Sequence, residues 1–269
     1  MKKILILSTA VATLYGASLD DFERLSGTLR IAGGTAHIPT MKRVAKEIAT
    51  VNSDLKIAIA GGGSGVGIKK VGEGLVDIGN AGRKASEKEI RKYSLVLHKW
   101  AIDGIAVVVH PANTVQDLNR TVIADIFAGK ITNWKAINGI DASIHLYTRD
   151  EASGTRKVFW KKFLHKSPIA KNANFVTSNG AMKRVVSGDK AAIGYLSAGF
   201  VDASVRGVAI DGDAPTTANI QNGSYPYARG LYSITKGAPK GAAKVFIDYL
   251  LSDHVQHEIV PAKGFIPVR

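Results

Sequence analysis

The 269-residue sequence contains no cysteine, and this absence excludes several classes of protein and site. A chain without cysteine has no disulfide framework, no thiolate ligand for a metal and no thiol that could carry a lipid anchor. Aromatic residues make up only 7% of the chain, which is few for a protein that stacks nucleic-acid bases on its rings. With 45% hydrophobic residues, the chain has the composition of an ordinary globular protein that folds around an apolar core.

The chain also lacks clusters of like charge, although basic residues exceed acidic ones by 36 to 22 and give a net charge of +14. It contains no run of five or more like charges, such as the basic arms that bind nucleic acids. A nucleic-acid-binding protein gathers Lys and Arg on one face, where they neutralise phosphates. The dispersed charge argues against that class, and we expect no nucleic-acid partner.

No apolar segment reaches the roughly 20 residues that a membrane span requires. Met1-Lys2-Lys3 precedes a mostly apolar stretch from Ile4 to about Ala17, which is the layout of a secretory signal peptide. We therefore predict a signal peptide over residues 1–17 and a mature protein free in a periplasm; a buried N-terminal strand or helix is the alternative. Removal of the signal peptide would take away Lys2 and Lys3. The mature chain would then have 34 basic residues against 22 acidic ones, a net charge of +12.

Short apolar runs, glycine turns and helical patterns alternate along the mature chain. Residues 56–60 are expected to form a strand that ends in glycines, and residues 104–109 have the length and composition of a buried parallel strand. Val158, Phe159 and Phe163 follow the next glycine turn at helical spacing. The repeated order of strand, turn and helix predicts an α/β fold with mainly parallel sheets. The length suggests about two domains, or one large one.

Three glycine-rich turns, at residues 33–36, 61–67 and 149–155, each follow an expected strand and open an expected helix. A helix start presents unpaired backbone N–H groups and the positive end of the helix dipole, and glycine lets an anion approach closely. Ordinary N-caps in tight turns have the same composition. Three such turns in one chain, one of them carrying Arg149 and Glu151, favour a shared anion site.

Stricter motifs are absent. The second turn has the spacing of a P-loop, but Ile68 stands where lysine is required, and no G-x-G-x-x-G passes through it. Val66 replaces the second glycine of a hydrolase G-x-S-x-G around Ser64. His254 and His257 have no third ligand nearby in the sequence. We therefore expect no metal, no cofactor and no catalytic residue, with an extracytoplasmic phosphatase as the alternative from another class.

The turns and their flanking segments resemble the phosphate-binding proteins of phosphate ABC transporters, which have the type II periplasmic solute-binding fold. Gly34-Thr35-Ala36, residues 62–65 and residues 76–83 resemble the family's phosphate turns, and residues 149–155 resemble its signature R-x-[DE]-x-S-G-T. The resemblance covers nearly all of the mature chain. It implies two α/β lobes joined by a hinge, a monomer that closes over one phosphate, and a membrane permease as partner. On that pattern lobe 1 is 26–107 plus 225–269 and lobe 2 is 108–224.

The resemblance also implies the roles of individual residues. Hydroxyl groups, backbone N–H groups and one guanidinium would bind the phosphate. The expected contacts are Thr35, Ala36, Ser64, Arg149, Glu151, Ser153, Gly154 and Thr155, with Gly34 and Arg83 beside them.

One departure from the family concerns the proton that phosphate carries near neutral pH. Many members have an aspartate acceptor where this chain has Ala81-Gly82-Arg83. We expect Glu151 either to accept that proton, which sulfate lacks, or to orient Arg149 through a salt bridge. Arg83 is expected to be a second cationic contact or part of an unrelated salt bridge. A binder of another oxyanion, sulfate or molybdate, is the nearest alternative in the same class.

Overall fold

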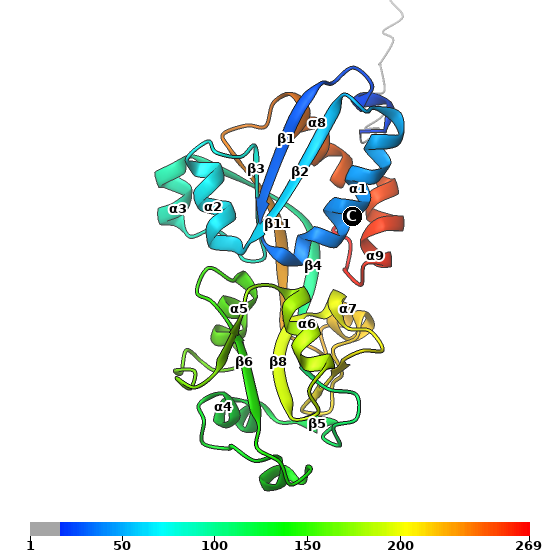
Figure 1. The fold of residues 1–269 in the computed structure, drawn as a ribbon. Helices are drawn as coiled ribbons and strands as arrows, with labels where there is room; N and C mark the ends of the chain where they lie inside the picture. The colour runs from blue at the N-terminus through cyan, green and yellow to red at the C-terminus, as the bar shows by residue number, and fades with distance from the viewer. Residues whose placement is uncertain (1–16) are drawn as a thin grey trace, which may run out of the picture.

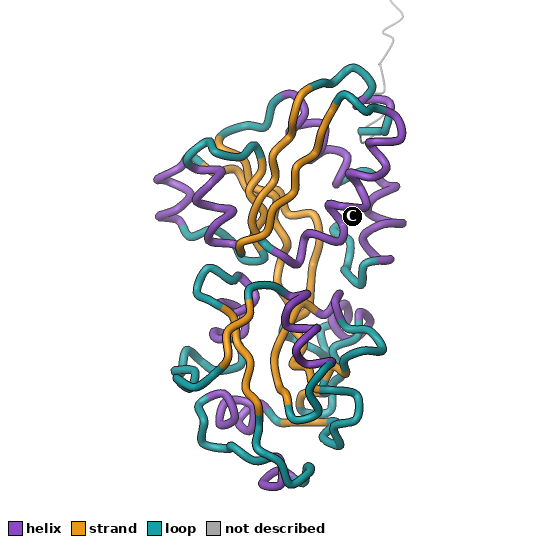
Figure 2. The backbone as a smooth tube through the Cα atoms, in the orientation of Figure 1, coloured by secondary structure: helices purple, strands orange, loops and turns teal. Residues whose placement is uncertain are grey.

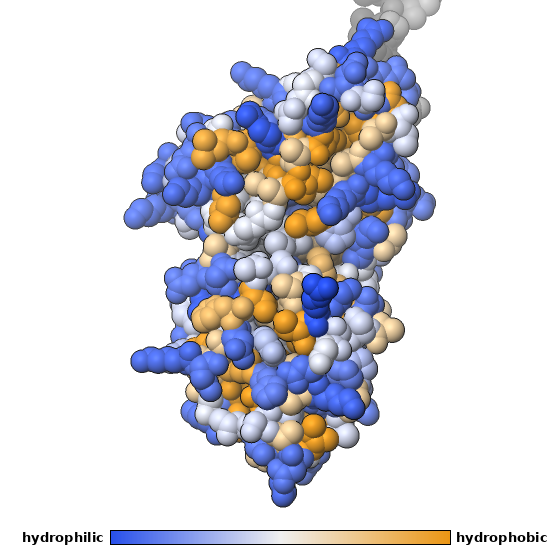
Figure 3. Space-filling view, viewed as in Figure 1, coloured by the Kyte–Doolittle hydropathy of each residue, from blue (hydrophilic) through white to orange (hydrophobic). Residues whose placement is uncertain are grey.

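The computed structural model describes residues 17–269, which form two lobes above and below a narrow waist (Figure 1). All but the last residue of the predicted signal peptide lies outside the described part of the chain. None of the described helices is long and apolar enough to cross a membrane. On the face shown in the space-filling view, hydrophilic residues cover much of both lobes, with smaller hydrophobic areas between them (Figure 3).

Lobe 1 contains three parallel strands, in the order β2-β1-β3, and helices on both sides of them (Figure 1). Its strands are β1 (Gly27–Gly33), β2 (Leu55–Gly62) and β3 (Ile78–Ala81), and its helices are α1 (Ile38–Val51), α2 (Ser64–Gly72), α3 (Glu87–Tyr93), α8 (Gly241–Leu250) and α9 (Val260–Ala262). The 3-10 turn η2 (Thr35–His37) joins β1 to α1.

Lobe 2 is built around a second group of strands, in which β6 is parallel to both β7 and β8. Its strands are β5 (Asp117–Leu118), β6 (His145–Arg149), β7 (Asn174–Val176), β8 (Ala192–Ser197), β9 (Arg206–Gly207) and β10 (Ala209–Ile210), and its helices are α4 (Arg120–Phe127), α5 (Gly154–Lys162), α6 (Asn179–Ser187) and α7 (Thr217–Asn222). Strand, turn and helix therefore recur in this lobe as in the first, and the predicted two-lobed α/β fold is confirmed.

Two long strands, β4 (Leu95–Val109) and β11 (Ala228–Lys236), cross the waist and make one continuous sheet (Figure 2). They are antiparallel to each other from Leu95 opposite Lys236 to Gly104 opposite Ala228, and β4 then continues antiparallel to β8. The expectation that residues 104–109 form a parallel strand was therefore wrong. Burial on both faces explains the apolar run, and burial does not determine strand direction.

Each lobe has its own hydrophobic core. In lobe 1, apolar residues from β1 and α1 pack with the C-terminal helices, for example Leu29, Val44 and Phe246. In lobe 2, Phe159 stacks on Tyr195 with a centroid distance of 4.0 Å. The lobe 2 cluster also includes Tyr227 and Ile266 of the return segment, so the main apolar contacts within each lobe form separate clusters that meet the crossing strands. The predicted lobe limits at 107/108 and 224/225 lie in or beside the crossing strands and stay predictions.

An ion pair between Asp103 and Arg229 is buried at the waist, where the two residues face each other across β4 and β11. Arg229 donates through Nε at 2.9 Å and Nη2 at 2.8 Å to the same carboxylate oxygen, and Ser197 donates to the other at 2.8 Å. Burial raises the pKa of Asp103, and the arginine opposes that shift. The crossing strands are therefore held together by a buried ion pair as well as by backbone hydrogen bonds.

Replacing Asp103 by asparagine should lower the free energy of unfolding by about 3 kcal/mol or more, because a buried guanidinium loses its counter-charge. Urea unfolding followed by circular dichroism measures the change. Asp125→Asn is the matched control, since Asp125 pairs with Lys130 at 2.8 Å on the surface and its loss should cost less than about 1 kcal/mol. Equal losses in the two variants would contradict the assigned role of the buried pair.

Candidate anion site

The three glycine-rich turns meet in one cavity between the lobes. Eight of the ten residues expected at the site line it, and their binding roles stay predictions. The lining residues are Gly34, Thr35, Ala36, Gly63, Ser64, Gly82, Arg149, Ser153, Gly154, Thr155 and Arg229. The volume that the centre of a water-sized sphere can occupy between them is only about 10 Å³. A cavity of that size suits a small ion rather than a sugar or an amino acid.

The wall from lobe 1 presents two hydroxyl groups. Thr35 lies in the turn after β1, and its Oγ1 accepts hydrogen bonds from the backbone and side-chain nitrogens of Asn179 in lobe 2, at 3.2 and 3.0 Å. Ser64 begins α2, and its Oγ accepts from the backbone N–H of Gly82 at 2.9 Å. Because both oxygens already accept, each hydroxyl keeps its proton to donate to a ligand.

The wall from lobe 2 is the start of α5, directly after the end of β6. Ser153 is the N-cap, and its Oγ accepts from the backbone N–H of Arg156 at 3.1 Å. The N–H groups of Gly154 and Thr155 lie in the first turn, where a helix offers no acceptor and its dipole favours an anion. The Thr155 hydroxyl makes no hydrogen bond within the described residues.

Arg149 supplies a cation at the end of β6, and its side chain is almost fully buried. Nη2 donates to the carbonyl of Thr177 at 3.0 Å, whereas Nε and Nη1 are buried without a partner among the described residues. Burial lowers the pKa of Arg149, since it disfavours the charged form. A buried cation with two unpaired donor nitrogens is unfavourable unless an anion is present. The arrangement is therefore suited to an anion.

Arg229 also lines the cavity, and the sequence analysis did not include it among the contacts. Arg229 lies far from the three glycine-rich turns in the sequence, and no local pattern signals that β11 passes beside the site. Asp103 balances its charge, and its Nη1 donates to the carbonyl of Gly82 at 3.2 Å. His37 adds no charge at neutral pH because burial lowers its pKa to about 3. Arg149 is therefore the unbalanced cation of the cavity.

Glu151 lies away from the cavity, and the expectation that it accepts a proton from the ligand or orients Arg149 was wrong. Its side chain is 92% exposed, and the guanidinium nearest to it is that of Arg156, at 3.9 Å. The turn directs this side chain to solvent because the adjacent Ala152 contacts lobe 1. No carboxylate therefore lines the cavity within the described residues.

Arg83 is also outside the cavity, so the expectation of a second cationic contact was wrong. The alternative expectation, that Arg83 takes part in an unrelated salt bridge, agrees with the structure. Its guanidinium donates to both carboxylate oxygens of Glu89, at 2.9 and 2.7 Å. These bonds lower the pKa of Glu89 to about 2. Glu89 also completes the capping box at the start of α3, which holds Arg83 on the surface of lobe 1.

The lobes touch around the cavity, so the structure is in a closed arrangement. The N–H of Gly65 in lobe 1 donates to the carbonyl of Ala152 in lobe 2 at 2.9 Å. Glycine is required at two of these contacts: a Cβ on Gly63 would lie 2.7 Å from the Ala152 carbonyl oxygen, and a Cβ on Gly154 would overlap Ser64 Oγ. Closure therefore requires a residue without a side chain at both positions, one in each lobe.

Comparison with known proteins agrees with this architecture. The model of the PBP superfamily domain matches residues 22–254. Phosphate-binding protein PstS of Bacillus subtilis is 39% identical over 248 residues, which cover 91% of this chain and 82% of that protein. A Clostridium perfringens structure with bound phosphate, described as a phosphate ABC transporter substrate-binding protein, has a TM-score of 0.84 and 36% identity and covers 90% of this chain and 100% of its own.

A second solved structure, an ABC-type phosphate transport receptor from Vibrio cholerae, has a TM-score of 0.71 and 31% identity. The similarity covers 88% of this chain and 99% of that one. These relatives match the chain across both lobes, and the family model matches most of its length. The chain therefore belongs to the PBP superfamily, and within it to the family of the phosphate-binding proteins.

Proposed function

We propose that this protein is an extracytoplasmic solute-binding protein that captures inorganic phosphate between its lobes and delivers it to the permease of an ABC transporter. The observation that carries the proposal is Arg149, a buried cation in a small cavity of hydrogen-bond donors, with two nitrogens that find no partner in residues 17–269. The relatives named for phosphate binding support the choice of anion. The N-terminal signal peptide expected from the sequence supports a periplasmic location, and a monomer is sufficient because one chain forms the whole cavity.

Phosphate would enter between open lobes and bind to donors from both. The Arg149 guanidinium neutralises charge, the hydroxyls of Thr35 and Ser64 donate from lobe 1, and the first turn of α5 donates from lobe 2. Closing the lobes removes water, which strengthens each of these contacts. The permease would then recognise the closed arrangement, in which surfaces of the two lobes lie side by side.

Within the cavity, Thr155 is the residue best placed to accept the phosphate proton. The hydroxyl oxygens of Thr35, Ser64 and Ser153 already accept bonds from protein N–H groups. Thr155 Oγ1 accepts none from the described residues and lies in the same cavity. A neutral acceptor repels sulfate less than a carboxylate does, so sulfate or molybdate binding is the second candidate function.

Phosphatase chemistry has less support. A hydrolase of this kind needs a nucleophile activated by a base or by metal ions. The described residues contain no group of three or more side chains that could hold a metal. The cavity has hydroxyl groups but no carboxylate or histidine to act as base. Binding without chemistry is therefore the proposed activity.

Arg149→Met should weaken phosphate binding at least about 30-fold, because removal of a buried charged partner costs 2 kcal/mol or more. Isothermal titration calorimetry measures the loss. Without phosphate the melting temperature should not fall, since two of the arginine nitrogens lack partners. Glu151→Gln is the control and should change phosphate affinity less than about twofold, because its side chain is 92% exposed. An equal loss in this control would contradict the assignment of Arg149.

Gly154→Ala should block closure while leaving each lobe folded. The added Cβ overlaps Ser64 Oγ of the other lobe, and the overlap disappears when the lobes separate. We expect phosphate affinity to fall about tenfold or more and small-angle scattering to show no compaction with phosphate. Gly180→Ala is the matched control in α6, since its Cβ would lie 3.8 Å from its nearest neighbour, Ser178 Oγ. Normal closure in Gly154→Ala would show that this contact is unimportant.

Thr155→Val should lower the ratio of phosphate to sulfate affinity about fivefold or more, because the phosphate proton loses its acceptor. Thr155→Ser should restore the ratio. Wild-type affinity should also rise with pH through the second pKa of phosphate, because Thr155 Oγ1 offers an acceptor for one proton and the monohydrogen form carries one proton. Competition calorimetry at several pH values tests both points, and an unchanged ratio in the valine variant would contradict the role of Thr155.

A further inference from the structure

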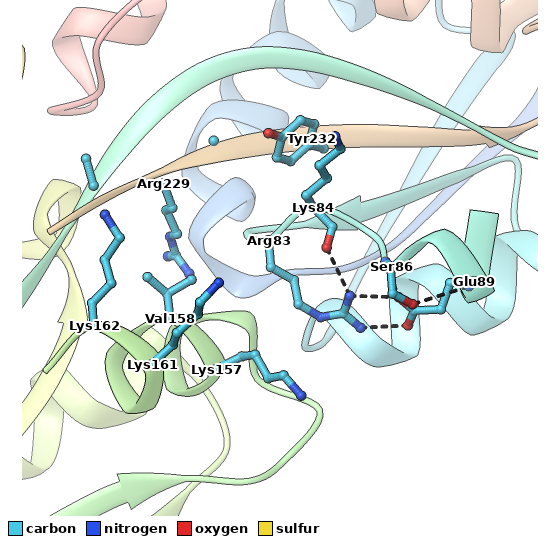
Figure 4. A pocket seen from close by; sticks show the side chains of 12 residues that line it. Arg83, Lys84, Ser86, Glu89, Lys157, Val158, Lys161, Lys162, Arg229 and Tyr232 are labelled. Atoms are coloured by element: carbon cyan, nitrogen blue, oxygen red, sulfur yellow. Dashed lines mark hydrogen bonds and ion pairs between the residues drawn. The ribbon is translucent and has the colours of Figure 1, made fainter. Parts of the chain in front are cut away.

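A second cavity, of about 590 Å³, lies beside β11 and is separate from the anion cavity except that Arg229 lines both. Figure 4 shows it between two walls: the segment from Arg83 to Glu89 in lobe 1 and the helix α5 in lobe 2. Tyr232 and Arg229 on β11 lie between these walls. The cavity is thus formed by both lobes and by a strand of the hinge.

The lining of this cavity is strongly cationic. Six of its side chains are basic and one is acidic. The acidic residue, Glu89, is already bound by Arg83 through two hydrogen bonds. The basic residues are Arg83, Lys84, Lys157, Lys161, Lys162 and Arg229. Six basic side chains against one acidic one make this cavity a local concentration of positive charge.

Several of these cations have no counter-charge. The ammonium groups of Lys84 and Lys161 make no hydrogen bond or ion pair with the described residues, and Lys157 only approaches the ring of Trp160, at 5.9 Å. Lys162 donates to the carbonyl of Pro226 at 2.7 Å. Burial lowers the pKa of Lys162, and the charge of Lys161 lowers it further. Repulsion among these groups would be relieved by an anion between them.

The size and charge of the cavity indicate which anion fits. Its volume lies in the range of small-molecule sites and far exceeds that of the anion cavity. One phosphate ion could contact only some of the cations, whereas a chain of condensed phosphate groups can reach both walls. The partners for such a ligand come from different lobes: Lys84 from lobe 1, and Lys157 and Lys161 from α5.

We propose that this cavity is a second anion site that binds a short linear oligophosphate, and that its occupancy favours the closed arrangement. An oligophosphate between the walls attracts Lys84 and Lys161, which otherwise repel each other as the lobes close. The start of α5 lines the anion cavity and its later turns line this one, so a single rigid helix connects the two sites. The effect on closure rests on the proposed capture of phosphate, whereas the oligophosphate site itself does not.

Titration of the mature protein with sodium tripolyphosphate by calorimetry tests the site. Phosphate is kept saturating, so that the anion cavity is already filled. We expect one molecule to bind, and the double variant Lys84→Ala/Lys161→Ala to weaken binding about tenfold. Lys42→Ala/Lys171→Ala removes the same charge from exposed positions of both lobes outside the cavity, and should weaken it less than about twofold. Neither pair of lysines lines the anion cavity, so all variants should bind phosphate normally when no tripolyphosphate is present.

Absence of tripolyphosphate binding by the wild-type protein, or equal weakening in both double variants, would overturn the proposed site. Coupling is tested by measuring phosphate affinity with and without tripolyphosphate. We expect each ligand to strengthen the other by the same factor, as linkage requires. No change in phosphate affinity would overturn the effect on closure. If the protein does not bind phosphate at all, the proposed function fails, and tripolyphosphate titration without phosphate still tests the second site.

Discussion

The guanidinium of Arg149 is the constraint on which the closed structure depends. It is buried between the lobes, and the described part of the chain pairs only one of its three nitrogens, so its charge is left for a ligand. The hydroxyls of Thr35 and Ser64 and the start of α5 offer donors around it, and no carboxylate competes among the described lining residues. Closing the lobes around an empty cavity would desolvate this charge without compensation. Ligand binding and closure are therefore coupled by the cost of one unpaired cation.

The contrast with Arg229 shows how one cavity uses two arginines differently. Arg229 is neutralised by Asp103 on the neighbouring strand, and that pair joins the crossing strands at the waist. Arg149 has no acidic partner among residues 17–269 and can attract an anion. If both were paired, the cavity would hold no net charge. If neither were paired, the two cations would repel each other across a dry cavity. The buried ion pair thus allows a second arginine to lie near the first.

The sequence predicts the local features well, because strand, glycine turn and helix start depend on neighbouring residues. The two lobes and the meeting of three turns followed from such patterns and from the family resemblance. Side-chain direction did not: Glu151 is adjacent to the site in sequence but directed to solvent, and Arg83 is bound by Glu89. Contributions from distant segments were missed as well. Arg229 lines the cavity and Asn179 hydrogen-bonds to Thr35 through tertiary packing, which no local pattern records.

The contacts across the cavity also set a limit on kinetics. Thr35 accepts from Asn179, and Gly65 donates to Ala152, so the two lobes are hydrogen-bonded to each other on both sides of the anion. The cavity admits the centre of a water-sized sphere over only about 10 Å³, so we expect a bound ion to leave when the lobes separate. The residence time of the ion is then set by the lifetime of the closed arrangement. The strength of any single contact does not determine it alone. A partner that pulls the lobes apart would control release without touching the ion.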